Sequence, residues 1–488
     1  MGKLIRPYLS QTLAGLWWLT LGAYALLALG HTELNRETPV IVAALAVSGL
    51  AIGVRARRIL IAFVVLFGLW ALSAPSLRPL LAFVAAGLTL AFISLIPWFT
   101  RQRTVLGHHR LLAYPVSITT RDRFLHTHVL GPTGSGKSSS VLMPMIWQDL
   151  SQGHGLCLIE PKGDLSVATF QAALATGHTV LYVDPEDHRA PHYNPLSGPA
   201  DVAAEGLAWA LDQTGESGHP FYATLARLEL LYAVLAVKET GGDEADLEMV
   251  MRFLRQEGFR REVLSACRDA RTLAYYAEQV GRQSQAKALE QRIGLLNRLE
   301  LLLVNPRVRI LFEGPGDFTW DQVLAERHVV IGPFSLANLG ATARLLGNLF
   351  WHGMVMATYR RPLEDRRPYF LYLDEFHQYV SPDLGDYLAL ARGYSVGITL
   401  AHQDLGQLRP ELKTAVMANC RQRVILGGIS VDDAKELAPL FGRSGNQIPD
   451  LRHLPLGHAW VERTEGGRLR RPVPLKLIHR PLGAGSAP

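Results

Sequence analysis

The sequence predicts an α/β fold with a largely parallel sheet, a helical insert and apolar helices before it. From Leu125 onward, short apolar runs typical of buried strands alternate with helical patterns. The alternation stops between Ala200 and Val308, where the pattern is helical throughout. Four uncharged apolar runs precede Arg101. We therefore expect an N-terminal apolar part, an α/β part and an all-α domain inserted into the α/β part.

The apolar part, residues 1–104, predicts a transmembrane anchor. Its four runs lack Asp, Glu, Lys and Arg, and they are Thr12–Gly30, Pro39–Val54, Ile59–Leu77 and Pro79–Thr100. A bilayer core needs roughly 20 apolar residues of helix, which the first, third and fourth runs supply. The distribution of Lys and Arg among the loops places both the N-terminus and everything after Arg101 in the cytoplasm. With both ends of the anchor on the same side of the membrane, the number of spans must be even, four or two. The alternatives are a signal peptide in the first run and a set of buried core helices.

Charge and cysteine content narrow the possibilities only slightly. The 488 residues carry a net charge of +6, which suits contact with a phosphate backbone or an anionic lipid surface but requires neither. The three cysteines are far apart and odd in number, so they indicate neither a disulfide framework nor a metal site. A reducing cytoplasm fits the part of the chain after the anchor.

The segment Gly131–Ser138 matches the P-loop pattern G-x-x-x-x-G-K-[ST] at every fixed position. A short apolar run, Thr127–Leu130, precedes it, and a helical pattern follows to about Leu150. In this context the loop amides and the helix N-terminus face an anion together. We therefore predict that ATP is bound by Gly131, Pro132, Thr133, Gly134, Ser135, Gly136, Lys137, Ser138 and Ser139.

A second element of a nucleotide site follows the helical insert. The apolar run Tyr369–Leu373 ends in Asp374 and Glu375, a Walker-B pattern that fixes two carboxylates at the edge of a sheet. Asp374 and the Ser138 hydroxyl are the expected Mg²⁺ site, and Glu375 is the expected group that polarises the attacking water. Lys137 is expected to neutralise the β- and γ-phosphates. Further candidate strands are His126–Leu130, Leu156–Ile159, Thr179–Val183, His328–Gly332, Val396–Ala401, Arg423–Leu426, Ala459–Glu462 and Val473–Leu477.

Two polar residues lie where an oligomeric motor would use them. Gln403 follows the candidate strand Val396–Ala401, so its amide is a candidate sensor of the γ-phosphate. Arg392 ends the helix after the Walker-B strand and is a candidate arginine finger for an adjacent subunit. The alternatives are a glutamine that caps a turn and an ordinary arginine at a helix C-terminus.

Several segments in one order resemble type IV coupling proteins of the TraG/TraD kind, within the HerA–FtsK group of motors. The resemblance covers roughly Leu106 to Leu454. Beyond the P-loop it rests on segments similar to the family's motifs, namely Val141–Pro144, Glu160–Asp164, Asn194–Leu196, Leu373–Phe376, Arg392–Ile398 and Gln403–Leu408. Two departures are the Glu at position 160, where Asp is commoner, and four apparent spans with almost no periplasmic mass between them.

The resemblance implies a RecA-like P-loop ATPase domain, residues 105–199 and 309–455, with an all-α insert at 200–308 and C-terminal strands and a flexible tail at 456–488. It implies a homo-hexamer anchored in a bacterial inner membrane, with ATP and Mg²⁺ as cofactors. The partners it implies are DNA, a relaxase or other protein cargo, and the components of a type IV secretion channel. Lys137, Ser138, Asp374, Glu375, Arg392 and Gln403 match family motifs and take the roles given above.

Three functions remain open at this point. The first is a coupling protein that drives relaxase–DNA or protein cargo into a conjugation channel. The second is a double-stranded DNA translocase like FtsK, which also carries four N-terminal spans. The third is an ATP-gated receptor that binds cargo without threading DNA. The helical insert also has a basic stretch, Arg252–Arg271 with Tyr275 and Tyr276 beside it, which predicts either a contact with DNA phosphates or a solvated, salt-bridged surface.

Overall fold

The computed structural model describes residues 102–212, 220–280, 285–380, 384–441 and 451–482. The four predicted membrane spans and the end of the C-terminal tail lie outside these ranges. Among the helices within them, none is long and apolar enough to cross a membrane. The membrane anchor therefore remains a prediction from the sequence.

Within these ranges the chain forms an α/β structure around an 11-stranded sheet, in the order β2-β1-β11-β10-β9-β3-β8-β7-β4-β6-β5. The run from β9 to β5 is parallel, and β10, β11, β1 and β2 extend it in antiparallel fashion. The strands are β1 Arg103–His109, β2 Pro115–Thr119, β3 Thr127–Leu130, β4 Gly155–Glu160, β5 Val180–Tyr182, β6 Val329–Pro333, β7 Tyr369–Asp374, β8 Val396–His402, β9 Gln422–Leu426, β10 His458–Glu465 and β11 Arg468–Leu477.

Each predicted strand is present. The central parallel strands β3, β4, β6, β7, β8 and β9 are buried along their whole length, so they read as continuous apolar runs. In β4, Leu156 and Leu158 face one hydrophobic core while Cys157 and Ile159 face the other. Strands β1 and β2 were not predicted. Strand β1 mixes buried with partly exposed residues, and both strands contain polar residues (Arg, Thr and His in β1, Ser and Thr in β2), so they lack the apolar run that marks the central strands.

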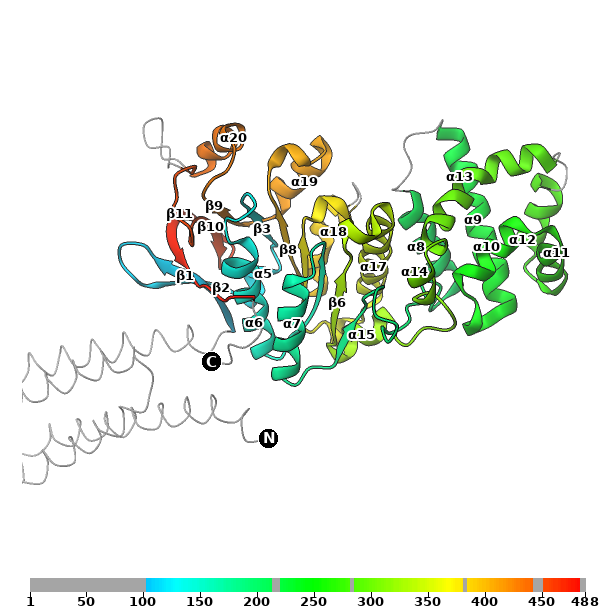
Figure 1. Cartoon of the computed structure of the whole chain (residues 1–488), viewed down its shortest axis with the longest axis horizontal. Coiled ribbons are helices and arrows are strands. Elements are labelled where there is room, and N and C mark those ends of the chain that lie inside the picture. Colours follow the sequence, from blue (N-terminus) through cyan, green and yellow to red (C-terminus); the bar gives the residue numbers. More distant parts are fainter. Residues whose placement is uncertain (1–101, 213–219, 281–284, 381–383, 442–450, 483–488) are drawn as a thin grey trace, which may run out of the picture. The chain divides into compact units, whose positions relative to one another are not determined.

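Helices cover both faces of the sheet (Figure 1). One core contains residues of α6 and α7, and the other contains residues of α8, α9, α10, α13, α17 and α18. The helices are α5 Thr120–Arg123, α6 Met143–Ser151, α7 Asp164–Ala175, α8 Ala200–Asp212, α9 Pro220–Gly241, α10 Leu247–Arg255, α11 Glu257–Ala266, α12 Ala270–Ala274, α13 Gln285–Leu303, α14 Pro306–Ile310, α15 Trp320–Glu326, α16 Leu336–Leu339, α17 Ala341–Arg360, α18 Leu384–Ala391, α19 Pro410–Asn419 and α20 Val431–Phe441.

The helical insert appears as a run of elements without a strand among its described residues. Helices α8 to α14 follow one another between β5 and β6, and α8 and α13 contact α17 (Figure 1). Residues 102–488 form one compact unit by their contacts, so the insert packs closely against the α/β part. The domain boundaries given above remain predictions.

Candidate nucleotide site

The P-loop joins β3 to a helix at the carboxyl edge of the parallel strands. Lys137–Leu142 form a π-helical turn that continues directly into α6. Two loop residues, Gly134 and Gly136, have φ of +79° and +90°, in the left-handed region that favours glycine. The loop therefore has the backbone conformation that lets successive amides face one anion.

Lys137 is folded back onto this loop. Its Nζ donates to the Gly131 carbonyl at 2.6 Å and lies 4.0 Å from Glu375 Oε1. Burial lowers the pKa of Lys137, and the nearby carboxylates of Asp374 and Glu375 oppose that effect. To reach a phosphate, the ammonium has to exchange a carbonyl oxygen for a phosphate oxygen of greater charge.

Asp374 ends β7 beside the first helical turn after the P-loop. Its Oδ2 lies 3.5 Å from Ser138 Oγ. Burial, reinforced by the charge of Glu375, raises the pKa of Asp374 to about 6. A buried carboxylate next to a hydroxyl is a site where a hard cation would relieve the charge repulsion, and both groups are oxygen ligands of the kind Mg²⁺ prefers. These residues fit a Mg²⁺ ion held with a nucleotide.

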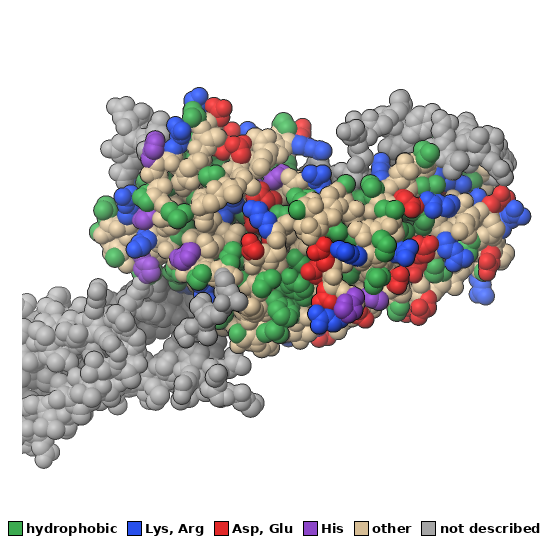
Figure 2. Space-filling view, viewed as in Figure 1, with side chains coloured by type: hydrophobic (Ala, Val, Ile, Leu, Met, Phe, Trp, Pro, Cys, Tyr) green, Lys and Arg blue, Asp and Glu red, His purple; other side chains and the backbone are tan. Residues whose placement is uncertain are grey.

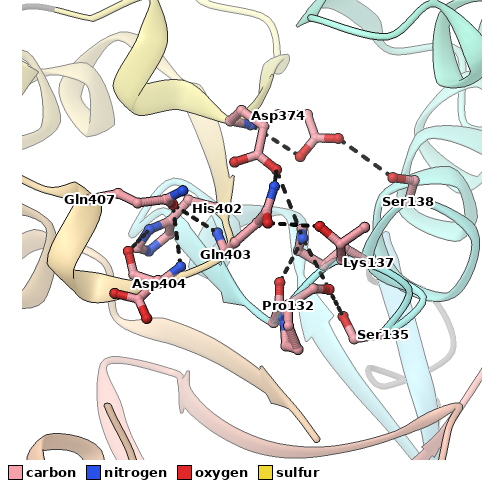
Figure 3. A network of polar contacts seen from close by, with 12 residues as sticks. Pro132, Ser135, Lys137, Ser138, Asp374, His402, Gln403, Asp404 and Gln407 are labelled. Carbon is pink, nitrogen blue, oxygen red and sulfur yellow. Dashed lines mark hydrogen bonds and ion pairs between the residues drawn. The ribbon is translucent and has the colours of Figure 1, made fainter. Parts of the chain in front are cut away.

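Glu375 and Gln403 connect the Walker-B strand with the P-loop. Gln403 Nε2 donates to Glu375 Oε1 at 2.6 Å, and the Thr133 hydroxyl donates to Gln403 Oε1 at 2.7 Å. The other oxygen of Glu375, Oε2, is buried and has no hydrogen bond within the described residues. The amide predicted as a phosphate sensor thus touches both the P-loop and the group expected to polarise water (Figure 3).

The loop that carries Gln403 is held by its own polar groups. The Gln407 Oε1 accepts from the backbone amides of Gln403 and Asp404, each at 3.3 Å. The Asp404 side chain accepts from the Gly406 amide at 2.6 Å, which completes a capping box. Figure 3 shows His402, Asp404 and Gln407 surrounding the base of this loop.

Two predicted residues, Ser139 and Arg392, lie outside the hydrogen-bonded group formed by the other predicted side chains of the site. Ser139 follows the P-loop, and its carbonyl accepts from the Arg480 amide at 2.8 Å. Arg392 begins a short 3₁₀ turn, Arg392–Tyr394, before the first residue of β8. Because β8 is parallel to β7 and is seven residues long, Arg392 lies at the opposite edge of the sheet, about 20 Å from Gln403. Its side chain is exposed, and the structure does not bring it to the P-loop of its own chain.

The family of type IV secretory system conjugative DNA transfer proteins matches residues 101–447. The chain belongs to this family. A comparison with curated proteins finds no match.

Three solved structures show the same fold as this chain. Plasmid coupling protein TrwB in complex with ADP and Mg²⁺ is 16% identical with a TM-score of 0.60, covering 77% of this chain and 90% of that chain. TrwB with the GTP analogue GDPNP is 17% identical with a TM-score of 0.59, covering 74% and 88%. VirB4 of Thermoanaerobacter pseudethanolicus is 15% identical with a TM-score of 0.51, covering 77% and 96%.

Two features of the site were not predicted from the sequence. His128 on β3 and His402 on β8 stack with ring centroids 5.0 Å apart, and their Nε2 atoms are 2.7 Å apart. The buried Glu160 accepts from the Lys162 and Ser166 amides, each at 3.0 Å, and its charge contributes to the raised pKa of Asp374. His128 lies within the predicted strand His126–Leu130, and His402 directly follows the predicted strand Val396–Ala401, which was the available signal. Glu160 stood within a family motif but had no assigned role.

The basic stretch of the insert is largely paired within the chain. Arg255 bonds Glu300, and Arg261 bonds Glu257 at 2.7 Å. Arg260 donates to the Phe253 and Leu254 carbonyls. Tyr276 is buried in the helical core, so it offers no exposed ring for stacking on a base. These contacts favour the salt-bridged surface over a DNA contact at this stretch.

Proposed function

We propose that this chain is the membrane-anchored ATPase of a type IV secretion or conjugation apparatus, and that it drives relaxase–DNA or protein cargo into the channel. The supporting observation is the meeting of the P-loop, Asp374, Glu375 and Gln403 at the carboxyl edge of one parallel sheet. Membership of the conjugative DNA transfer family supports the same process.

The geometry supports a division of labour within one site. Lys137 would bind the β- and γ-phosphates after leaving the Gly131 carbonyl. Ser138 and Asp374 would hold Mg²⁺, which when bound neutralises charge on the phosphate oxygens. Glu375 would orient and polarise the attacking water through Oε2, which has no hydrogen bond among the described residues. The contacts of Gln403 with Glu375 and Thr133 would depend on whether the γ-phosphate is present. Hydrolysis would therefore change the position of the loop that carries Gln403.

The assembly is part of the proposal. A homo-hexamer tethered to the bacterial inner membrane by residues 1–104, with its ATPase part in the cytoplasm, accounts for the apolar N-terminus. It also gives Arg392 a role, because an exposed arginine remote from its own P-loop is placed to contact a neighbouring subunit's site in such a ring. Mixed rings containing Arg392→Ala subunits should then lose more activity than the fraction of mutant subunits. Loss in strict proportion to that fraction would count against the arginine finger.

The test is plasmid transfer in a deletion strain complemented with the wild type or with Lys137→Ala. We expect the variant to abolish transfer, because the phosphates lose their counter-charge, while its level in the membrane fraction stays normal. Transfer at the wild-type rate would contradict the proposal.

Two other functions are distinguished by purified protein. An FtsK-like translocase is expected to have an ATPase stimulated by double-stranded DNA without any relaxase. An ATP-gated receptor is expected to bind relaxase tightly with no stimulation by DNA. The coupling function predicts stimulation by DNA together with relaxase binding.

A further inference from the structure

The hairpin between β1 and β2 ends in an exposed apolar tip, residues 110–114. Leu111 and Leu112 are 83% and 71% exposed, and Tyr114 is 41% exposed. Adjacent leucines this open to water contribute nothing to either hydrophobic core. Single exposed apolar residues are ordinary in soluble proteins. Two adjacent leucines at a protruding turn beside a tyrosine form a candidate interaction surface.

The tip is a built structure. His109 Nδ1 accepts from the Leu111 and Leu112 amides at 3.3 and 3.1 Å, and the ring stacks on Tyr114 with centroids 4.9 Å apart. The His109 amide donates to the Tyr114 carbonyl at 2.8 Å, and Ala113 closes the turn with φ of +51°. The backbone is thus satisfied internally while the two leucine side chains are held outward.

Basic residues lie in this tip and on the strand beside it, where the Arg110 amide donates to the Pro474 carbonyl at 3.0 Å. Arg110 lies within it, and Lys476 of the adjoining β11 pairs with His108 of β1. Arg471 precedes Lys476 on the same strand, and all three cations are exposed, with no ion pair in the described part of the chain. The nearby Glu465 is already bonded to Arg103 and Arg470. Figure 2 shows hydrophobic, basic and histidine side chains together at the end of the molecule that carries β1 and β2, where acidic ones are sparse.

We propose that this tip docks on the surface of an anionic phospholipid bilayer, with Leu111 and Leu112 in the interface and Arg110, Arg471 and Lys476 against the headgroups. The inference rests on the proposed membrane anchor. Nine residues separate Arg101, at the end of the apolar part, from Leu111. They span at most about 35 Å, so the tip stays within reach of the bilayer. Apolar and aromatic side chains with a basic surround are the chemistry that binds anionic lipid.

A bilayer suits this surface better than a second protein. A stable protein interface takes about 800 Å² from each partner, more than a tip of five residues presents. A tethered chain needs only a weak contact, because the anchor supplies a high local concentration of lipid. Docking would fix the orientation of the ATPase part toward the membrane.

The test uses the full chain in liposomes containing phosphatidylglycerol. Leu111→Cys and the control Leu363→Cys each receive an environment-sensitive fluorophore. Leu363 is similarly exposed, at 76%, and is followed by the acidic Glu364 and Asp365. The native cysteines are buried, and the wild type treated in the same way measures their labelling. Lipids carrying a nitroxide on the acyl chain then report direct contact.

We expect the nitroxide lipids to quench the probe at position 111 at least twofold and to leave the probe at 363 unchanged. Exchanging phosphatidylglycerol for phosphatidylcholine, or adding Arg110→Glu, should reduce the quenching. A probe at 111 without lipid quenching overturns the docking, including the case of a blue-shifted probe buried against another protein. Flotation with the liposomes tests the anchor separately: a chain that does not float overturns both proposals, whereas one that floats unquenched overturns the docking alone.

Discussion

At the scale of single residues, Glu375 has three energetically unfavourable features that a carboxylate with a purely structural role would avoid. Its φ of +50° lies in the left-handed region, its side chain is buried, and its Oε2 lacks a hydrogen bond among the described residues. Strained, buried and under-satisfied groups concentrate at functional sites, where a ligand completes their contacts. The bond from Gln403 holds Oε1, and His377 Nδ1 lies 3.9 Å from Oε2, so Oε2 is the oxygen that the described residues leave to bind a water molecule.

Glu375→Gln is therefore expected to separate binding from hydrolysis. The amide keeps the size of the side chain and accepts from Gln403, but it cannot take a proton from water. We expect ATP affinity within about threefold of wild type and a turnover at least 100-fold lower, the usual contribution of a general base. Equilibrium binding of a fluorescent ATP analogue and single-turnover hydrolysis measure the two quantities. Normal hydrolysis by the variant would show that another group activates the water.

At the scale of elements, a histidine pair ties the strand before the P-loop to the strand before Gln403. The Asp404 carbonyl can only accept, so His402 Nδ1 donates to it, at 3.0 Å. Burial lowers the pKa of His402 well below its ordinary value, so the ring is neutral and its Nε2 accepts from His128 Nε2. The pair thereby holds the backbone of the Gln403 loop by one hydrogen bond.

Two substitutions of His402 by side chains of similar shape test its bond to the Asp404 carbonyl and its bond to His128 one at a time. In His402→Asn the amide can still donate to the Asp404 carbonyl, whereas in His402→Gln it reaches only toward His128. We expect the Gln variant to turn over ATP several-fold more slowly than the Asn variant, with equal ATP affinity. The difference should vanish in a Gln403→Ala background, because the loop then carries no sensor. Equal turnover of the two variants would assign the pair to packing alone.

A second link between elements is the buried group of Arg123, Asp149 and Tyr372. Arg123 donates to Asp149 and to Tyr372 Oη, and Tyr372 Oη donates to Asp149. These residues lie in α5, α6 and β7, so the group joins the P-loop helix to the Walker-B strand. The guanidinium also stacks over Phe370 at 3.8 Å.

Asp149→Ala should destabilise the protein by about 3–5 kcal/mol, because it leaves a buried guanidinium without its counter-charge. The matched control is Arg123→Met with Asp149→Leu, which removes both charges and keeps apolar volume. We expect this double variant to be clearly more stable than Asp149→Ala in thermal unfolding. A double variant that is no better than the single one would mean that packing, and not the uncompensated charge, causes the loss.

Sequence reasoning succeeded where a signal is contiguous. The P-loop, the Walker-B strand and the central strands each occupy one short segment, and their apolar runs follow from burial on both faces. The Arg123 group has members 26 and 223 residues from Asp149, and polar residues interrupt the apolar ones in β1 and β2, so no local pattern marks either. The contact between Gln403 and Glu375 required β8 and β7 to be neighbours, which only the folded sheet reveals.

At the scale of the whole molecule, several buried histidines have a pKa that burial lowers below its ordinary value. Burial lowers the pKa of His126 and His154 to about 4 and that of His128 and His352 to about 3. The His352 ring packs against Trp209, tilted by 35° with centroids 3.8 Å apart, and neither of its ring nitrogens has a hydrogen bond in the described residues. Each ring is therefore neutral in the folded protein at pH 5, whereas an unfolded chain with a pKa of 6.5 is protonated there.

Stability should consequently fall as the pH drops from 6.5 toward 4, because the unfolded chain binds more protons over that window. Each such histidine contributes up to about 1.4 kcal/mol per pH unit. Buried carboxyls with a raised pKa, such as Asp374, act in the opposite direction, so a single-site comparison is needed to isolate the effect. His352→Phe keeps an aromatic ring against Trp209 and removes the imidazole that takes up a proton. Between pH 7 and pH 5 its unfolding free energy should fall by about 2 kcal/mol less than that of the wild type, as measured by urea unfolding in detergent. Parallel curves for the two proteins would mean that His352 takes up its proton in the folded state.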